Sequence, residues 1–584
     1  MKRLSKALGR KTLPKTLGHK KWLAAAIPLI MAAQAQGFEF YSGGIEGSFD
    51  SQFSMGSSWR VEEADDKLLT GVNMNDGNAN YNKGDAFSQI FKGSHDLQVT
   101  YKNFGAFVRG KYWYDSALEN NNVNSGHGPT STIGHPTVPQ LALQIQGAGN
   151  SELDDSEFNE YAKFSGATVL DAFIYGEFEL GDMPLDVRLG KQVVSWGEST
   201  FIFGGINAIN PVDVSAFRRP GAEIKEGLIP VNMAYASVGV TDDLSVEAFY
   251  QLEYQESVIP GCGTYFSTND YASEGCTLVN LNDQASLQRN DDGIRNPSND
   301  GQFGLAVRYL LDDTELGFYA MNIHSRLPIA SGITGSTGPG AAGGATYFVE
   351  YPEDIQLAGV SFATNVGSIA LSGEVSHKKN LPIQINANDL IGGTLAFGNA
   401  AGGAPADLNT DIQAALATGG PGGTNTTIDG SRAFDVTQAQ MTAIKFFDQV
   451  AGASRVILIG EAGYSFIHDF DESDTAIKFG QSGVYEGTDD GFVTESSYGY
   501  RARVVAKYSD VIAGVNLTPV LAWKHDIEGY APNPGGAFSQ GEKSLGLTLK
   551  ADYLSTYNAA ISYTQYMDGD ATKVSDRDFA SISV

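Results

Sequence analysis

From about residue 44 onward, apolar and polar side chains alternate along the chain with a period of two. Such alternation predicts β-strands that have one apolar and one polar face. The segment 170–180 is typical, because five apolar side chains share one side and three carboxylates lie on the other. The apolar side holds Leu170, Ala172, Ile174, Phe178 and Leu180, and the opposite side holds Asp171, Phe173, Tyr175, Glu177 and Glu179.

The predicted strands come in pairs, with a short polar turn inside each pair and a long irregular segment between pairs. One strand at about 44–60 precedes the pairs and one at about 577–584 follows them, which gives 18 strands, with 16 as the alternative count. In the fifth pair the turn is expected at Thr364-Asn365. The eight pairs are 97–114, 168–196, 231–254, 303–321, 355–375, 441–466, 500–523 and 545–566.

Short turns that alternate with long loops are typical of an all-β transmembrane antiparallel β-barrel with short periplasmic turns and long outer loops. A soluble β-sandwich would also alternate, with its apolar face turned inward. The number and length of the strands, and charges of both signs on the polar face, favour the barrel. We therefore expect apolar side chains to face lipid and polar side chains to face a lumen.

The first 35 residues differ from the rest, because they carry eight basic residues, no acid and a short apolar stretch from Trp22 to Ala33. They end in Ala33-Gln34-Ala35, which predicts a signal peptide cleaved near Ala35 and a mature barrel from residue 36 to 584. Removing these residues takes the formal charge from −29 to −37. Such an acidic chain repels nucleic acid, and export in a Gram-negative cell places the barrel in the outer membrane.

Residues 200–229 break the alternation and form the third outer loop. Gly204, Gly205 and Asn210-Pro211 end the strand pattern. The loop is compact and its charges are dense, and charges folded into a lumen need partners. We expect this loop to narrow the pore, while a structural loop packed on the rim is the alternative. The charged residues predicted to form the constriction are Asp213, Arg218, Arg219, Glu223, Lys225 and Glu226.

The polar face of the strands supplies candidate lumen-lining charges, and both signs occur among them. They are Arg109, Lys111, Glu177, Glu179, Arg188, Glu247, Glu253, Arg308, Arg501 and Arg503. Apolar side chains also fall on that face, among them Phe173, Tyr175, Phe249, Ile457 and Ile459. Charges of both signs predict a lumen without strong ion selectivity. The apolar side chains predict that the same lumen can contact an apolar molecule.

Few residues suggest chemistry beyond passage through a pore. Cys262 and Cys276, 14 positions apart in an exported chain, are expected to form a disulfide in a loop. No His lies between them, which argues against a metal site. The sequence has no H-E-x-x-H, P-loop or G-x-S-x-G motif, so we expect neither an enzyme nor a cofactor.

Three stretches resemble the domain-of-unknown-function family 1302 of bacterial outer-membrane proteins. They are "RLGKQVVSWGES…GINAINPVDVSAFRRPGAEIKEGLIP" (188–230), "CGTYFSTNDYASEGC" (262–276) and "LAWKHDIEGYAPNPGGAFSQGEKSLGL" (521–547). The resemblance covers essentially the whole mature chain and implies a single barrel. Relatives tend to be encoded beside a periplasmic lipid-binding-type protein and a resistance-nodulation-division exporter. The resemblance therefore implies partners of these kinds and traffic of a hydrophobic or lipid-like compound.

Four functions are compatible with the sequence, and the sequence favours the fourth, a barrel enzyme, least. The first is an outer-membrane transport barrel for a hydrophobic or lipid-like compound, with outer-membrane lipids around it. The second is a water-filled general diffusion porin, which would conduct ions steadily and need no partner. The third is a sealed structural or docking barrel, whose lumen would pass nothing.

Overall fold

The computed structural model describes residues 37–584, apart from several short or loop segments. The segments outside the description are 72, 121, 125–150, 283–284, 335–343, 396–426, 474–476, 482–484, 486–487 and 568. The predicted signal peptide, residues 1–35, lies outside the described residues as well. No helix in the described part of the chain is long and apolar enough to span a membrane.

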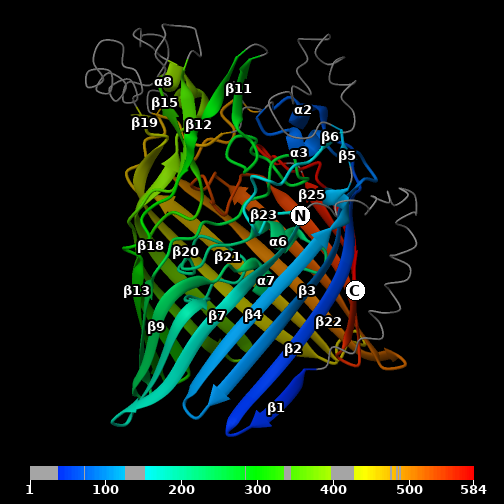
Figure 1. Cartoon of the computed structure of the whole chain (residues 1–584), viewed down its shortest axis with the longest axis vertical. Helices are drawn as coiled ribbons and strands as arrows, with labels where there is room; N and C mark the ends of the chain where they lie inside the picture. The colour runs from blue at the N-terminus through cyan, green and yellow to red at the C-terminus, as the bar shows by residue number, and fades with distance from the viewer. Residues whose placement is uncertain are drawn as a thin grey trace, which may run out of the picture.

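Eighteen strands form one closed antiparallel sheet, in which each strand pairs with the next along the chain (Figure 1). The sheet closes where Phe579 to Ser583 of the last strand pair with Arg60 to Gly56 of the first. The predicted barrel with 18 strands is therefore confirmed. Its strands are β2 (Ile45–Arg60), β3 (Ala86–Tyr101), β4 (Phe104–Asp115), β7 (Ser165–Leu180), β8 (Met183–Gln192), β9 (Val231–Thr241), β10 (Leu244–Gln251), β13 (Phe303–Leu311), β14 (Thr314–Ile323), β17 (Ile355–Val366), β18 (Ile369–Gln384), β20 (Ser431–Asp448), β21 (Arg455–Ile467), β22 (Ser496–Ile512), β23 (Val515–Glu528), β24 (Lys543–Tyr553), β25 (Tyr557–Met567) and β26 (Phe579–Ser583).

All short turns lie at one end of the barrel and all long loops at the other, with a further strand, β1 (Phe38–Ser42), paired to β2 at the short-turn end (Figure 1). The expected turn at Thr364-Asn365 is wrong by three residues. Thr364 pairs in register with Leu371, and the chain turns only at Gly367 and Ser368. Gly367 has a φ of +62°, a conformation that glycine adopts at little cost.

The apolar side of each strand faces outward, as expected for a barrel in lipid. Ile174 is 60% exposed and Leu180 is 52% exposed on the outside of β7. Leu170, expected on the same side, is only 1% exposed and packs in a buried cluster with Phe158 and Tyr161. The register between β4 and β7 shifts at this point, which turns Leu170 away from the lipid side.

The long-loop end carries short helices and a second, five-stranded sheet in the order β11-β12-β16-β15-β19 (Figure 1). Among the long loops, loop 1 is residues 61–85, loop 3 is residues 193–230, and loop 4 is residues 252–302. The outer elements are α2 (Asp66–Leu69), α3 (Asp76–Ala79), α4 (Ser116–Glu119), β5 (Asn122–Val123), β6 (Ser151–Glu152), β11 (Leu278–Asn282), β12 (Ala285–Arg295), β15 (Ile329–Ile333), β16 (Thr346–Glu350), α8 (Ala387–Leu395) and β19 (Thr427–Ile428).

Candidate pore constriction

Loop 3 leaves β8 and runs inside the barrel before it returns to β9. It contains two short helices, α6 (Val214–Arg218) and α7 (Ile224–Gly227), which lie within the barrel at about mid-height (Figure 1). Residues 198–206 bond to side chains of β18, β20 and β21. Residues 213–226 bond to β2, β3 and β4, which lie far from those strands around the barrel. Loop 3 therefore crosses the lumen.

Apolar side chains fix the first part of loop 3 to the inner wall. Trp196, Ile206 and Ile209 are fully buried and pack against inward residues of β9, β10 and β14, including Met233 and Phe249. Each such side chain contributes about 1.5–3 kcal/mol by leaving water. The Trp196 indole nitrogen also donates to Glu247 at 2.7 Å, so its one polar group is satisfied.

Two buried wall glutamates hold the crossing segment through its backbone. Glu374 of β18 accepts N–H bonds from Glu198, Ser199 and Ile206. Glu461 of β21 accepts from the backbone nitrogens of the next stretch along the loop, Thr200 to Ile202. A carboxylate that receives three donors is a strong anchor, since bonds to a charged acceptor are about twice as strong as neutral ones.

Glycines in loop 3 permit this close approach. A Cβ at Gly205 would lie 1.9 Å from the Oε1 atom of Glu374, and one at Gly197 would lie 2.5 Å from its Oε2 atom. Gly197 also has a φ of +88°, in the left-handed region that favours glycine. The local sequence therefore bends the chain away from the strand path and brings its backbone onto the wall glutamate.

Ion pairs hold the second part of loop 3 on the far side of the lumen. The Lys92 ammonium of β3 lies 2.5 Å from the Glu226 carboxylate and donates to the Gly221 carbonyl at 2.8 Å. Lys111 of β4 lies 3.6 Å from Asp213, which also caps the N-terminus of α6 by accepting from Ala216. These lysines and acids are nearly or fully buried, so each charge needs the other.

The remaining predicted constriction residues also have partners. Glu223 and Lys225 pair with each other and both bond to Gln52 of β2. Arg218 lies over the Phe266 ring, and Arg219 lies over Trp113 and donates to the Tyr161 carbonyl at 2.9 Å. Most of these charges therefore position the loop, rather than face open water.

Apolar side chains of loop 3 are left facing the lumen. Phe203 is 67% exposed, although its carbonyl accepts a bond from the inward side chain of Gln438 on β20. Ile224, at the start of α7, is 74% exposed, and Phe217 on α6 is also exposed. Large apolar side chains in contact with lumen water are a surface that an apolar molecule would cover.

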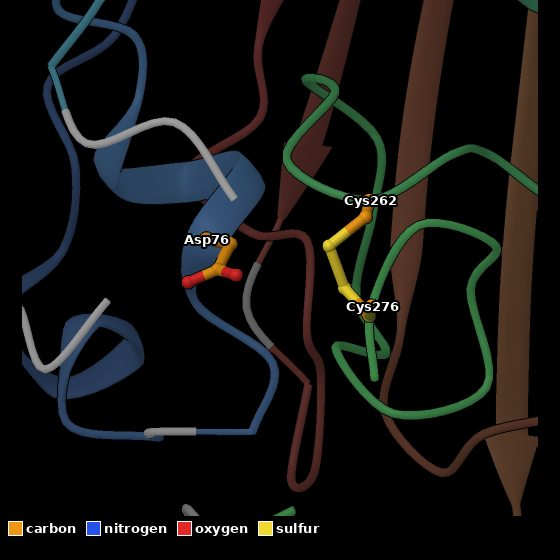
Figure 2. A group of neighbouring side chains, drawn as sticks. All are labelled: Asp76, Cys262 and Cys276. Atoms are coloured by element: carbon orange, nitrogen blue, oxygen red, sulfur yellow. A yellow bond between two sulfur atoms is a disulfide. The ribbon is translucent and has the colours of Figure 1, made fainter. Parts of the chain in front are cut away.

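A disulfide stands at the long-loop end above loop 3. It joins Cys262 and Cys276, as the sequence predicts, with their Cα atoms 5.3 Å apart. Asp76 of α3 lies beside this bond (Figure 2), and the possible metal-ligand atoms of these three residues lie within 4.8 Å of one another. Because both sulfurs are in the disulfide, no thiolate is available here to bind a metal ion.

The family of the chain follows from its sequence. A family model described as "Protein of unknown function (DUF1302)" matches residues 20–584. This chain belongs to the DUF1302 family. A comparison with curated proteins finds no significant match.

Solved structures similar to this DUF1302 chain are barrels at low identity. Acinetobacter baumannii OccAB1 gives a TM-score of 0.40 at 10% identity, over 94% of this chain and 97% of that chain. Pseudomonas aeruginosa OpdK, solved with vanillate, gives 0.36 at 7% identity, over 92% and 96%. Salmonella typhi OmpF, in complex with daunomycin, gives 0.34 at 9% identity, over 94% and 98%.

Most of the predicted lumen-lining residues of the DUF1302 barrel engage in ion pairs on its inner wall. Arg109 lies 2.7 Å from Asp96, Arg188 lies 2.9 Å from Asp186, and Arg501 lies 2.7 Å from Asp526. Arg308 bridges Glu247 and Glu315 at 2.9 and 2.7 Å.

The other predicted lumen residues differ in their surroundings. Glu177 and Glu179 are exposed near the short-turn end of β7. Glu253 lies in loop 4 rather than on a strand, and it accepts from the backbone nitrogen of Asn232. Arg503 forms no ion pair within the described residues, and its buried Nε atom has no hydrogen-bond partner.

Sequence reasoning missed the importance of Glu374 and Glu461 of this DUF1302 protein. Their place on the polar face of a strand shows only that they face inward. The available signal was that each is an acid among apolar and small residues, where a buried charge must have partners. Nothing in the pattern of the strands says that loop 3 supplies those partners.

Proposed function

We propose that this protein is an outer-membrane channel for a hydrophobic or lipid-like amphipathic compound, with loop 3 as its constriction. The observation that carries the proposal is the pair of exposed apolar side chains, Phe203 and Ile224, on a loop that crosses the lumen. An apolar molecule passing the loop would cover these side chains, and roughly 25 cal/mol per Å² of apolar surface would favour that contact.

The inner wall adds apolar surface in the same lumen. Phe107 and Phe173 lie inward on β4 and β7 with ring centroids 5.7 Å apart, and Tyr175 continues the row at 6.3 Å from Phe173. Across the barrel, Phe446 on the inner side of β20 is 46% exposed. A lumen with rings on both walls supports passage of a molecule that has an apolar part.

The family resemblance supports partners for this transport. A periplasmic lipid-binding-type protein and a resistance-nodulation-division exporter would deliver or collect the compound at the short-turn end. Transport of this kind needs no catalytic residue, so we propose a channel rather than an enzyme.

Two other functions compete, and a single-channel experiment separates all three. Purified barrel is placed in a planar bilayer, and octyl glucoside, a neutral amphipath, is added below its micelle concentration, with glucose as the polar comparison. We expect octyl glucoside to interrupt the ion current while glucose does not. Equal behaviour of the two sugars would indicate a water-filled porin, and absence of any current would indicate a sealed barrel.

The double variant Phe203→Ala, Ile224→Ala tests the role of loop 3. Loss of two apolar contacts is expected to shorten the octyl glucoside blocks about tenfold. Leu554→Ala is the matched control, because Leu554 is equally exposed but lies in the turn between β24 and β25. Blocks of unchanged duration in the double variant would contradict the proposed constriction.

A further inference from the structure

Three cations of the inner wall stand apart from the rest. Arg503 and Lys507 lie on β22, and Lys550 lies on β24. Arg503 pairs in register with Ile459 and so lies on the same face as Glu461, which holds loop 3 in the lumen. On β23, Thr518 pairs with Lys550 of β24. The adjacent Leu517 pairs with Tyr508 of β22, which directly follows Lys507. Lys507 and Lys550 therefore lie at one level on either side of β23.

These cations lack the acidic partners that other lumen cations have. Arg501 lies two residues before Arg503 on the same face of β22, and it pairs with Asp526. Lys524 on β23 pairs with Asp526 and Glu542. Within the described residues, Arg503, Lys507 and Lys550 form no ion pair, and the buried Nε atom of Arg503 has no hydrogen-bond partner. A partly buried guanidinium that has no acidic partner attracts an anionic ligand.

An apolar strip runs directly beside the cations. Val505 lies between Arg503 and Lys507 on the same face, and it pairs with Ile457 on one side and Val520 on the other. Ile457 in turn pairs with Phe446, whose ring is exposed to the lumen. Cationic and apolar surface thus adjoin on β20 to β24.

The facing wall has the opposite charge. Glu177 and Glu179 are exposed on the inner side of β7, and they form no ion pair within the part of the chain that the structure describes. In the closed strand order β7 lies about opposite β22, and both glutamates lie near the short turns, as do Lys507 and Lys550. Asp552 shares the inward face of β24 with Lys550 and accepts a hydrogen bond from Asn516, so cations still outnumber the unpaired acid on this wall. An anion is therefore attracted to this wall and repelled from the one with Glu177 and Glu179.

We propose that Arg503, Lys507 and Lys550 form a binding subsite for the head of an amphipathic anion, a carboxylate or phosphate with a single apolar tail. The tail lies along Val505, Ile457 and Phe446. The inference rests on the proposed function and gives it a substrate class. The anion reaches this subsite from water and passes loop 3 on its way through the lumen.

The test compares probes that share one tail and differ in charge. Octanoate, octyl phosphate, octyl glucoside and octylammonium are added to single channels in neutral phosphatidylcholine bilayers. We expect the two anions to block the current longest and octylammonium to block it least. A sodium octanoate gradient should also shift the reversal potential toward that of octanoate, which shows passage.

The triple variant Arg503→Gln, Lys507→Gln, Lys550→Gln is expected to shorten octanoate blocks about tenfold and leave octyl glucoside blocks unchanged. Lys445→Gln is the matched control, since Lys445 is near the same turns but shares its face with the lipid-facing Leu458. Added salt should weaken the octanoate block of the native channel only.

Three results would overturn the inference. They are equal block by octanoate and octyl glucoside, an unchanged octanoate block in the triple variant, and the same block from phosphatidylglycerol in the bilayer without octanoate. The last would show that the subsite takes membrane lipid. In each case, a glucoside block that still depends on Phe203 would leave the proposed function standing, so the two failures are distinguishable.

Discussion

Acidic residues of the lumen differ in the hydrogen-bond partners of their carboxylate oxygens. Glu179 faces water, whereas Glu374 and Glu461 hold six backbone N–H groups of loop 3 between them. A buried N–H group that loses its acceptor costs about 1–3 kcal/mol. The position of loop 3 therefore depends on two side chains that belong to other parts of the sequence.

We predict that Glu374→Ala frees the crossing segment of loop 3. Local stability should fall by about 2 kcal/mol, so the amides of residues 198–206 should exchange with deuterium roughly thirtyfold faster. Mass spectrometry of exchange gives the measurement, and Glu179→Ala is the control. Exchange rates equal to those of the native protein would show that the carboxylate does not hold the loop.

Gly205→Ala should produce the same effect without any change of charge. The added methyl group would collide with the Glu374 carboxylate, so the loop must move away from the wall. We expect faster exchange at 198–206 and a larger single-channel conductance. Gly460→Ala is the matched control, because a Cβ at Gly460 on β21 meets nothing within 4 Å. An unchanged conductance in Gly205→Ala would contradict the close approach.

At the scale of elements, the disulfide loop 262–276 organises the outer loops. Its carbonyl at Gly263 accepts from Asn80, next to α3, and the nitrogen of Asp270 donates to Asn73 of loop 1. Thr264 contacts α3 so closely that a Cβ at Gly77 would lie 2.2 Å from its carbonyl oxygen. Loop 1 thus packs on a surface whose shape depends on the Cys262–Cys276 bond.

Replacing both cysteines by serine should loosen this packing and leave the barrel intact. The bond closes a loop of about 15 residues, so its loss should cost about 3 kcal/mol. We expect limited proteolysis to cut loops 1 and 4 at least tenfold faster, while β-sheet circular dichroism stays unchanged. Equal cleavage of variant and native protein would show that the loops hold without the bond.

At the scale of the whole molecule, the outer loops hold buried acids that make their stability depend on pH. Loop 4 buries two acids, and burial raises the pKa of Asp270 and of Glu274 to about 7. Burial and the charge of Asp270 also raise the pKa of Asp76 in loop 1 well above its usual range. In an unfolded loop these groups would titrate near pH 4.

The loops should therefore become less stable as pH rises from about 4 through 7, because the folded loops bind more protons in that range. We predict faster proteolysis of loops 1 and 4 at pH 8 than at pH 5. Asp270→Asn keeps the shape without the ionisation and should reduce that difference severalfold. If the variant shows the same difference in proteolysis between pH 5 and pH 8 as the native protein, Asp270 is not the cause of that difference.

The sequence shows the strands and the place of loop 3 because both depend on local alternation. Loop 3 interrupts that alternation with glycines and prolines near Asn210, so its start is visible. Leu170 was misplaced because a register shift depends on the neighbouring strand, and the turn near Gly367 was misplaced because Thr364 also fits a turn. The contacts of Glu374 with residues about 170 positions earlier depend on the path of loop 3, which no local pattern encodes.

Loop 3 also links two distant parts of the barrel wall. It is bonded to β18 and β21 at one end and to β3 and β4 at the other. Lateral pressure in the membrane that flattens the barrel must therefore change the distance that loop 3 spans. The width of the aperture is thereby coupled to the roundness of the barrel, and we predict that membrane tension changes its single-channel conductance.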